Sequence, residues 1–214
     1  MHSLRHIAVE GPIGVGKTSL ALLLADLVGA ELVLEEPEQN PFLPDFYADP
    51  ERWALQTQLS FLISRHQQQV KLRQMNLFQN RIITDYIFEK DAIFARLTLK
   101  GRELELYRRI SELLTPEIAV PDLVVYLQST PQHLLANIRI RDVDYERDLE
   151  LDYLIDLCST YNRFFTHWNR CPLLIVKTTQ IDFISNAEHQ KRLIDRILAA
   201  PANSRSVFPE AELD

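Results

Sequence analysis

Glycine and cysteine are scarce in this chain. Only five of its 214 residues are glycine, whereas average usage near 7% predicts about fifteen in a chain of this length. The two cysteines, Cys158 and Cys171, are too few for a framework of several disulfide bonds, and neither lies in a zinc-binding or Cys-x-x-Cys spacing. Disulfide-stabilised and zinc-stabilised scaffolds are therefore excluded, and both thiols are expected to be reduced.

Long apolar segments and blocks of basic residues are also missing. The most apolar stretch, residues 20–34, carries Asp26 and Glu31, so we predict no membrane-spanning helix. The first residues reach a strand-like segment without a basic and apolar leader, which predicts a cytoplasmic protein. With 23 Lys and Arg against 30 Asp and Glu, the formal net charge is −7. Because nucleic-acid affinity depends on neutralising phosphates with Lys and Arg, nucleic acid is not expected as a partner.

The chain does have enough apolar residues for a folded core. Hydrophobic residues make up 46% of it, which suffices for one core in a single domain of about 200 residues. Short apolar runs predict strands at residues 6–10, 32–34, 81–84, 123–127 and 173–176. Helical patterns are found at residues 17–28, 50–74, 131–141, 146–168 and 187–199, with two more helices on either side of Gly101.

This alternation predicts an α/β fold with a five-stranded, mainly parallel sheet flanked by helices. Residues 40–49 are expected to form a loop with at most one helical turn. We assign residues 1–200 to one domain. Residues 201–214 mix Pro, Ser, Glu and Asp and are expected to form a mobile tail.

Three of the five glycines lie within six residues, in a segment that fits the phosphate-binding pattern Gly-x-x-x-x-Gly-Lys-[Ser/Thr] between a predicted strand and a predicted helix. Backbone N–H groups of such a loop surround a β-phosphate, Lys17 neutralises charge on the β- and γ-phosphates, and Thr18 offers its hydroxyl to Mg²⁺. The sequence therefore predicts binding of ATP with Mg²⁺ by Gly11, Pro12, Ile13, Gly14, Val15, Gly16, Lys17, Thr18 and Ser19.

Two carboxylates follow predicted strands. Glu36 comes after the second strand and Asp85 after the third, and ligands of parallel sheets bind beyond these strand ends. Glu36 is the candidate base that removes a proton from a hydroxyl acceptor, with Glu35 left open as the alternative. Asp85 is the candidate that holds the metal or its water. A helix cap or a solvated charge is the alternative for each residue.

The chain resembles the deoxynucleoside kinase family, which includes the deoxyguanosine, deoxyadenosine and deoxycytidine kinases. The resemblance covers about residues 5–185. It rests on residues 7–18, 36–37, 46–53 with Gln58, 64–65, 85–95 and 129–154. The stretch Tyr-x-x-Pro-Glu-Arg-Trp at residues 47–53, followed by Gln58, is unusually specific to this family. The resemblance implies a P-loop kinase fold with a helical lid, ATP-dependent phosphorylation of a deoxynucleoside 5′-hydroxyl in nucleotide salvage, and a homodimer joined through helices within residues 88–115 and 146–168.

The resemblance also implies roles for individual residues. Glu36 matches the base that activates the 5′-hydroxyl, and Tyr47 and Glu146 match the pair that hydrogen-bonds the sugar 3′-hydroxyl. Gln58 matches the side chain that reads the base edge, and Phe94 the ring against which the base lies.

Arg65 and Asp91 match a charged pair that purine and deoxycytidine kinases keep, which favours deoxyadenosine or deoxyguanosine as the substrate. From the helical repeat alone, Gln58 and Arg65 lie seven residues apart and share a helix face. The alternative for them is a solvated or salt-bridged helix surface.

The chain departs from the family pattern at the third motif and in the lid. Asp85 is followed by Tyr86 and Ile87 instead of Arg and Ser. In the lid, Asn137 and Val143 stand at two arginine positions, so Arg141 is the matched arginine, expected to stabilise the transferred charge. Arg139 and Arg147 lie close enough in sequence to substitute for the missing arginines.

Two other functions stay open, and the departures favour the second of them. One is a P-loop kinase for another small acceptor, such as a nucleoside monophosphate. Such an acceptor needs further cationic side chains, and residues 40–64 contain only Arg52. The other is a nucleotide-binding regulatory protein without phosphoryl transfer, although such a protein has no need of a nucleoside pocket.

Overall fold

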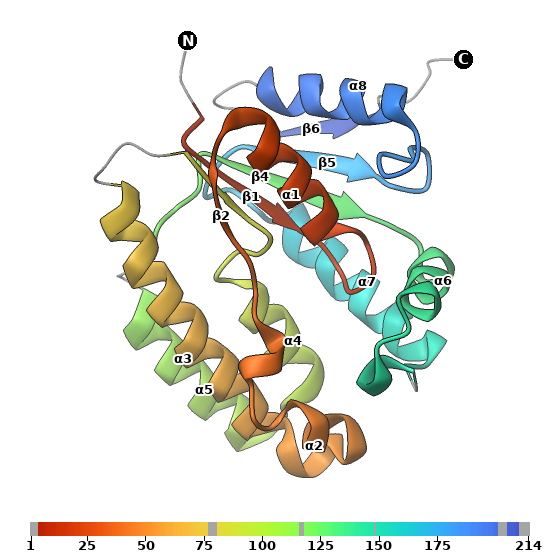
Figure 1. The fold of residues 1–214 in the computed structure, drawn as a ribbon. Helices are drawn as coiled ribbons and strands as arrows, with labels where there is room; N and C mark the ends of the chain where they lie inside the picture. Colours follow the sequence, from red (N-terminus) through yellow and green to blue (C-terminus); the bar gives the residue numbers. More distant parts are fainter. Residues whose placement is uncertain (1–3, 77–80, 116–117, 148, 201–204, 210–214) are drawn as a thin grey trace.

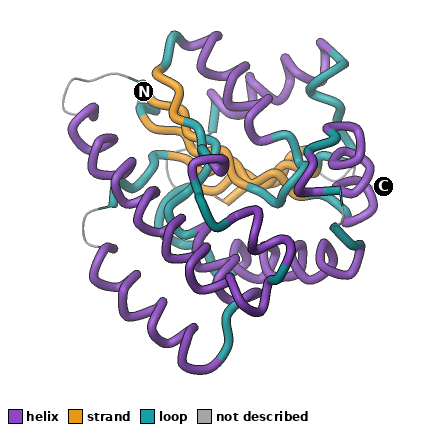
Figure 2. The backbone as a smooth tube through the Cα atoms, turned by 60° about the horizontal axis from the view of Figure 1, so that its bottom comes forward, coloured by secondary structure: helices purple, strands orange, loops and turns teal. Residues whose placement is uncertain are grey.

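The computed structural model describes residues 4–76, 81–115, 118–147, 149–200 and 205–209. Six parallel strands form one sheet in the order β2-β3-β1-β4-β5-β6. The strands are β1 (His6–Glu10), β2 (Glu31–Val33), β3 (Ile82–Thr84), β4 (Leu123–Gln128), β5 (Leu173–Lys177) and β6 (Arg205–Phe208). Helices cover both faces of this sheet (Figures 1 and 2).

The helices are α1 (Lys17–Val28), α2 (Leu43–Ala48), α3 (Pro50–Asn76), α4 (Lys90–Thr98), α5 (Gly101–Leu114), α6 (Pro131–Arg141), α7 (Leu151–Thr166) and α8 (Ala187–Leu198), with short 3₁₀ turns at Pro37–Gln39 and Asp144–Glu146. Helix α3 begins at Pro50, whose fixed φ suits a first helical position. Among the described residues, no helix is both long and apolar enough to cross a bilayer.

The predicted α/β fold with a parallel sheet and flanking helices is confirmed, but the sheet has six strands instead of five. Strand β6 pairs in parallel with β5, from Leu173 opposite Arg205 to Val176 opposite Phe208. The expectation of a mobile tail over residues 201–214 is therefore wrong for residues 205–208. The other tail residues, 201–204 and 210–214, lie outside the described residues.

Two further boundaries differ from the prediction. The helix expected over residues 146–168 is interrupted, because Glu146 ends a 3₁₀ turn and α7 begins only at Leu151. The loop expected over residues 40–49 contains α2, which begins with Leu43 and Pro44. Both changes position Tyr47 and Glu146, the residues matched to a sugar hydroxyl.

The apolar side chains form two clusters instead of one core. The larger cluster joins the sheet to α1, α7 and α8. The smaller cluster lies among α2, α3, α4 and α5 and is made by Leu43, Phe46, Ala54, Leu62, Phe88, Ala95, Leu99 and Tyr107. Helix α4 contributes to both clusters, through Ile93 and Ala95 respectively. This helix therefore links the sheet to the helical layer, and its first turn lies beside the pocket described below.

His6 is a buried polar residue at the start of β1, which lies between β3 and β4 in the sheet. Its Nε2 lies 3.2 Å from Thr84 Oγ1, and the Thr84 hydroxyl donates to the Tyr86 carbonyl at 2.9 Å. The hydroxyl therefore accepts from the ring, which places the proton of a neutral imidazole on Nε2. Nδ1 is buried without a hydrogen-bond partner among the described residues. Burial lowers the pKa of His6 to about 4, and Asp122 offsets this only in part.

His6 is expected to make the fold less stable in acid. In the unfolded chain this histidine has a pKa near 6.5, whereas in the folded chain its pKa is about 4. Between these two pH values the unfolded state binds a proton that the folded state does not bind, so the free energy of unfolding falls as the pH drops from 6.5 to 4. Between pH 7 and 4.5 the loss should be about 2 kcal/mol larger in the wild type than in His6→Gln, measured by urea unfolding. Equal losses would contradict this assignment. His133→Gln, at an exposed position, should follow the wild-type curve.

Candidate active site

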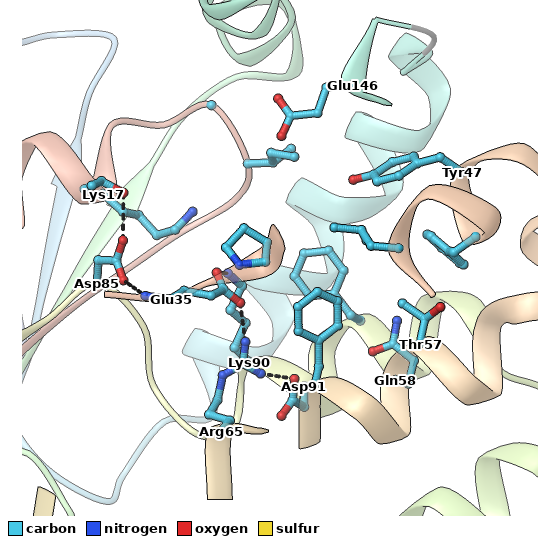
Figure 3. Close-up of a pocket in the computed structure, with 18 of the residues that line it drawn as sticks. Lys17, Glu35, Tyr47, Thr57, Gln58, Arg65, Asp85, Lys90, Asp91 and Glu146 are labelled. Carbon is cyan, nitrogen blue, oxygen red and sulfur yellow. Dashed lines mark hydrogen bonds and ion pairs between the residues drawn. The ribbon is translucent and has the colours of Figure 1, made fainter. Parts of the chain in front are cut away.

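A pocket of about 220 Å³ opens beyond the carboxyl ends of β1, β2 and β3. The P-loop and Asp85 form one end of it, α2 and α3 form the other end, and α4 lies between them (Figure 3). Its lining includes Ile13, Gly14, Lys17, Thr18, Glu35, Tyr47, Thr57, Gln58, Phe61, Arg65, Asp85, Lys90, Asp91, Phe94, Arg141, Glu146 and Tyr153. The structure thus brings together most of the residues predicted for the site, from seven separate segments.

The P-loop connects β1 to α1 in a conformation that requires glycine. Gly11, Gly14 and Gly16 all have positive φ. A Cβ on Gly11 would lie 2.6 Å from the Leu127 carbonyl oxygen, and one on Gly14 would lie 2.8 Å from Ile138 Cγ1. The loop is therefore packed against β4 on one side and against the lid helix α6 on the other. Gly29 and Gly101 also have positive φ, so all five glycines occupy backbone conformations that other residues rarely adopt.

Lys17 reaches from α1 into the pocket. Its Nζ donates to the Pro12 carbonyl at 3.1 Å. Burial, together with the neighbouring Lys90 charge, lowers the pKa of Lys17 to about 8. An anion beside Nζ would favour the charged form, and this is the chemistry expected where a triphosphate binds.

Asp85 lies at the P-loop end of the pocket and makes two hydrogen bonds there. Its Oδ2 accepts a hydrogen bond from Thr18 Oγ1 at 2.7 Å, and its Oδ1 accepts one from the Glu35 backbone N–H at 2.7 Å. A hydroxyl and a carboxylate in contact supply the hard oxygen ligands that Mg²⁺ prefers. The described residues contain no cluster of three or more His, Cys, Asp or Glu side chains able to hold a metal alone. These two residues therefore fit a Mg²⁺ whose remaining ligands are phosphate oxygens and water.

The two glutamates after β2 have different surroundings, and Glu36, the predicted base, is not the one that lines the pocket. Glu35 lines the pocket, whereas Glu36 is exposed and precedes the 3₁₀ turn that begins at Pro37. Successive side chains of a nearly extended segment alternate in direction, so only one of two neighbours can face the pocket. The alternative kept open in the sequence, Glu35, is the carboxylate in position to act on a bound acceptor. Glu36 is at the N-cap position of the turn Pro37–Gln39, and its side chain makes no cap hydrogen bond there.

Glu35 is held by two cations from two different helices. Arg65 from α3 pairs with Glu35 Oε1 and also with Asp91, and Lys90 at the start of α4 pairs with Glu35 Oε2. The side chains of Arg65 and Asp91 are each only 4% exposed. Burial alone would raise the pKa of the Glu35 carboxyl, but the charges of Lys90 and Arg65 lower it to about 2. Glu35 is therefore ionised at neutral pH.

The far end of the pocket is suited to a nucleoside. Gln58 is 3% exposed, and its Oε1 has no hydrogen-bond partner among the described residues. A buried acceptor of this kind costs free energy unless a ligand donates to it. Phe94 presents its ring in the same pocket and packs edge-to-face against Tyr161, with ring centroids 6.3 Å apart. Tyr47 from α2 and Glu146 from the turn Asp144–Glu146 both line this pocket (Figure 3).

The lid region departs from an arginine-rich arrangement. Asn137 donates from Nδ2 to the Gly14 carbonyl at 2.9 Å, so α6 is tied directly to the P-loop. Arg141 lines the pocket and forms an ion pair with Glu146. Arg147, one of the two proposed substitutes, pairs instead with Asp142 and Asp144 on the exposed side of the turn. Arg139, the other substitute, is exposed.

Three charged residues in or beside the pocket were not predicted to take part or were ranked second, and two of them line it. They are Glu35, Lys90 and Glu10. Glu10 is fully buried at the end of β1 and accepts hydrogen bonds from the Gly11 N–H at 2.7 Å, the Ile87 N–H at 2.9 Å and the Tyr161 hydroxyl at 3.2 Å. The available signal was a glutamate at the end of the apolar segment His-Ile-Ala-Val-Glu.

The chain is similar in sequence and in fold to known deoxynucleoside kinases. A sequence model described as "Deoxynucleoside kinase" matches residues 7–200. Deoxyguanosine kinase of Bacillus subtilis (strain 168) is 36% identical over 206 residues, which are 91% of this chain and 100% of the relative. Deoxyadenosine kinase of Dictyostelium discoideum is 34% identical over 171 residues, 77% of this chain and 68% of the relative. A structure of deoxyadenosine kinase from M. mycoides with products dCMP and a flexible dCDP bound has the same fold, with a TM-score of 0.77 at 20% identity over 90% of this chain and 98% of that one.

Breaking the buried ion pairs should destabilise the fold strongly. Arg65→Gln leaves the carboxylates of Glu35 and Asp91 with one cation fewer, and removing one partner of a buried pair typically costs about 3 kcal/mol or more. The exposed pair of Arg109 and Glu105, with side chains 73% and 62% exposed, is the matched control, because Arg109→Gln removes the same charge from a solvated pair. Chemical unfolding should show a large loss for the first variant and little change for the second. Similar losses would mean that burial does not set the strength of this cluster.

Proposed function

This chain belongs to the deoxynucleoside kinase family, and we propose that it transfers the terminal phosphoryl group of ATP to the 5′-hydroxyl of a purine deoxynucleoside, deoxyguanosine or deoxyadenosine. One observation carries the proposal. A single pocket contains the P-loop lysine at one end, an orphaned buried amide at the other, and the ionised carboxylate of Glu35 between them (Figure 3). The family membership supports a kinase, and the pocket supports a nucleoside as its acceptor.

Glu35 is the residue proposed to act on the acceptor hydroxyl. Its carboxylate accepts the hydrogen bond of the 5′-OH and orients a lone pair of the oxygen toward the terminal phosphorus. As the new O–P bond forms and the bond to the leaving ADP oxygen breaks, the hydroxyl proton passes to the carboxylate. A base with so low a pKa contributes chiefly by orientation, and in phosphoryl transfer most of the catalysis is positioning and charge stabilisation.

Charge on the phosphates is proposed to be met by residues at the other end of the pocket. Lys17 binds the β- and γ-phosphate oxygens, and Thr18 and Asp85 would hold Mg²⁺, which offsets charge on the same oxygens when bound. Arg141, from the end of the lid helix, is the proposed arginine that stabilises charge on the transferred group. The P-loop backbone holds the rest of the triphosphate.

The nucleoside is proposed to bind along α3 and α4. Tyr47 and Glu146 bind the 3′-hydroxyl, and the amide of Gln58 pairs with the edge of the base while Phe94 lies against it. The pair of Arg65 and Asp91, together with relatives named deoxyguanosine and deoxyadenosine kinases, supports a purine. A homodimer and a cytoplasmic location stay predictions from the sequence.

Exchanging the two adjacent glutamates for glutamine tests the role of Glu35. Glu35→Gln keeps the size of the side chain but removes the carboxylate that accepts the proton, so kcat should fall by about 10²- to 10⁴-fold. Glu36→Gln is the matched control one residue away and should keep kcat near the wild-type value. ATP binding, followed by calorimetry, should survive in both variants. A loss of kcat confined to Glu36→Gln would return the role to Glu36.

An acceptor screen with a matched variant tests the substrate class. A coupled assay of ADP formation with deoxyguanosine, deoxyadenosine, deoxycytidine, thymidine and dTMP should give the highest kcat/KM with a purine deoxynucleoside. Gln58→Leu removes the buried amide and should lower kcat/KM for that substrate by about 10- to 100-fold. Gln56→Leu, at an exposed position on the same helix, should have little effect. Preference for dTMP would indicate a monophosphate kinase, and turnover of none would indicate a regulatory protein.

A further inference from the structure

Lys90 is a buried cation whose position is costly. It is the first residue of α4 and only 8% exposed. Lysine is rarely buried unless it is paired, and a positive charge is disfavoured at a helix N-terminus, where the helix dipole is positive. Burial and the helix dipole both oppose a lysine here. Residues that violate two such rules at once are typical of functional sites.

The ion pair with Glu35 does not by itself account for Lys90. Arg65 already pairs with the other oxygen of the same carboxylate. Lys90 and Lys17 line the same pocket, Lys90 from the start of α4 and Lys17 from the start of α1. A phosphoryl group that enters this pocket carries more negative charge than the single Glu35 carboxylate, and both ammonium groups can donate hydrogen bonds to it.

The direction of the side chain suits such a contact. Side chains in a helix point back toward the N-terminus, so a lysine at the first position of α4 extends past the helix end and into the pocket. Lys90 Nζ donates to Glu35 Oε2, and Lys17 reaches into the same pocket from α1 (Figure 3). The carboxylate proposed to orient the 5′-hydroxyl therefore lies between two lysines.

The residue after Asp85 supplies no charge of its own to this space. Tyr86 is 1% exposed and lies under the Arg65 guanidinium, with the guanidinium carbon 5.2 Å from the ring centroid. The aromatic ring supports Arg65, which in turn pairs with Glu35 and Asp91. Among the described residues of the β3–α4 connection and the first turn of α4, Lys90 is the cation that faces the reacting end of the pocket.

From this arrangement we propose that Lys90 is a phosphate-binding residue on the acceptor side of the site. Its ammonium contacts the phosphoryl group as this group reaches the 5′-oxygen, and it remains in contact with the 5′-phosphate of the product. Lys17 binds the phosphates from the donor side, so the transferred group moves between two lysines. The inference rests on the proposed function and adds a residue that distinguishes the product from the substrate.

Binding measurements separate a phosphate contact from a role in holding Glu35. Calorimetry should be run with deoxyguanosine and dGMP, and with deoxyadenosine and dAMP as a second pair, on the wild type, Lys90→Gln and Lys90→Arg. Lys90→Gln should weaken monophosphate binding by about 10- to 100-fold and change nucleoside binding by less than about threefold. Lys90→Arg, which keeps the charge, should recover most of the monophosphate affinity. Lys100→Gln, at the exposed N-terminus of α5, removes a lysine away from the pocket and should match the wild type with all four ligands.

Equal weakening of nucleoside and monophosphate would overturn the proposal, because it would mean that Lys90 acts only through the shape of the pocket. Unchanged monophosphate binding would overturn it as well. If Lys90→Gln unfolds, the nucleoside and monophosphate affinities of Lys90→Arg are compared with those of the wild type instead. A folded arginine variant that has lost the preference for the monophosphate over the nucleoside would also reject the proposal.

A double substitution supplies a catalytic test. If Lys90 acts only by positioning Glu35, Lys90→Gln should have no further effect in a Glu35→Gln background. The proposal expects a further loss in kcat of about tenfold or more. Absence of any deoxynucleoside phosphorylation by the wild type would reject the proposed function. If the wild type is active but the double variant is no slower than Glu35→Gln alone, only the role of Lys90 is rejected.

Discussion

The ionic contacts of Glu35 are the constraint on which the rest of the site depends. Its backbone N–H is bound by Asp85 at the end of β3, and its carboxylate is bound by Arg65 from α3 and Lys90 from α4. These charged groups therefore join the ends of β2 and β3 to the middle of α3 and the start of α4. Buried ion pairs of this kind add little net stability compared with apolar packing, but they do fix geometry, because any displaced partner leaves an uncompensated charge.

The two apolar clusters explain why a charged pocket lies where it does. The larger cluster completes the packing of the sheet, and the smaller one completes the packing of α2, α3, α4 and α5. Side chains of both clusters reach the pocket. Ile13 and Phe94 pack against the larger cluster, and the smaller cluster contributes Leu43, Phe46 and Phe61. The pocket between the two layers is lined by these apolar side chains together with charged groups that pair across it, and it keeps room for a ligand.

The sequence predicts those features that depend on local pattern. Glycine spacing predicts the P-loop, and apolar runs predict most strands, because both signals lie within a few neighbouring residues. Gln58 and Arg65 follow from the helical repeat and the family resemblance together. The choice between Glu35 and Glu36 could not be made from spacing, since a shift of one residue in a nearly extended segment reverses the side-chain direction. Lys90 meets Glu35 from 55 positions further along the chain, so no local pattern marks it. Strand β6 has four residues, of which only Phe208 is buried, and it is stabilised by the edge of β5 more than by its own hydrophobicity.

The contact between Arg141 and Glu146 links the two ends of the pocket. The arginine is proposed to serve the phosphate and the glutamate the sugar, yet they are five residues apart and bind each other. Under the proposed function, a sugar hydroxyl that donates to Glu146 would share this carboxylate with the guanidinium of Arg141. Nucleoside binding would then change how Arg141 is held, and any resulting change in affinity would be equal in both directions. One short turn would thereby connect the acceptor end of the pocket to the donor end.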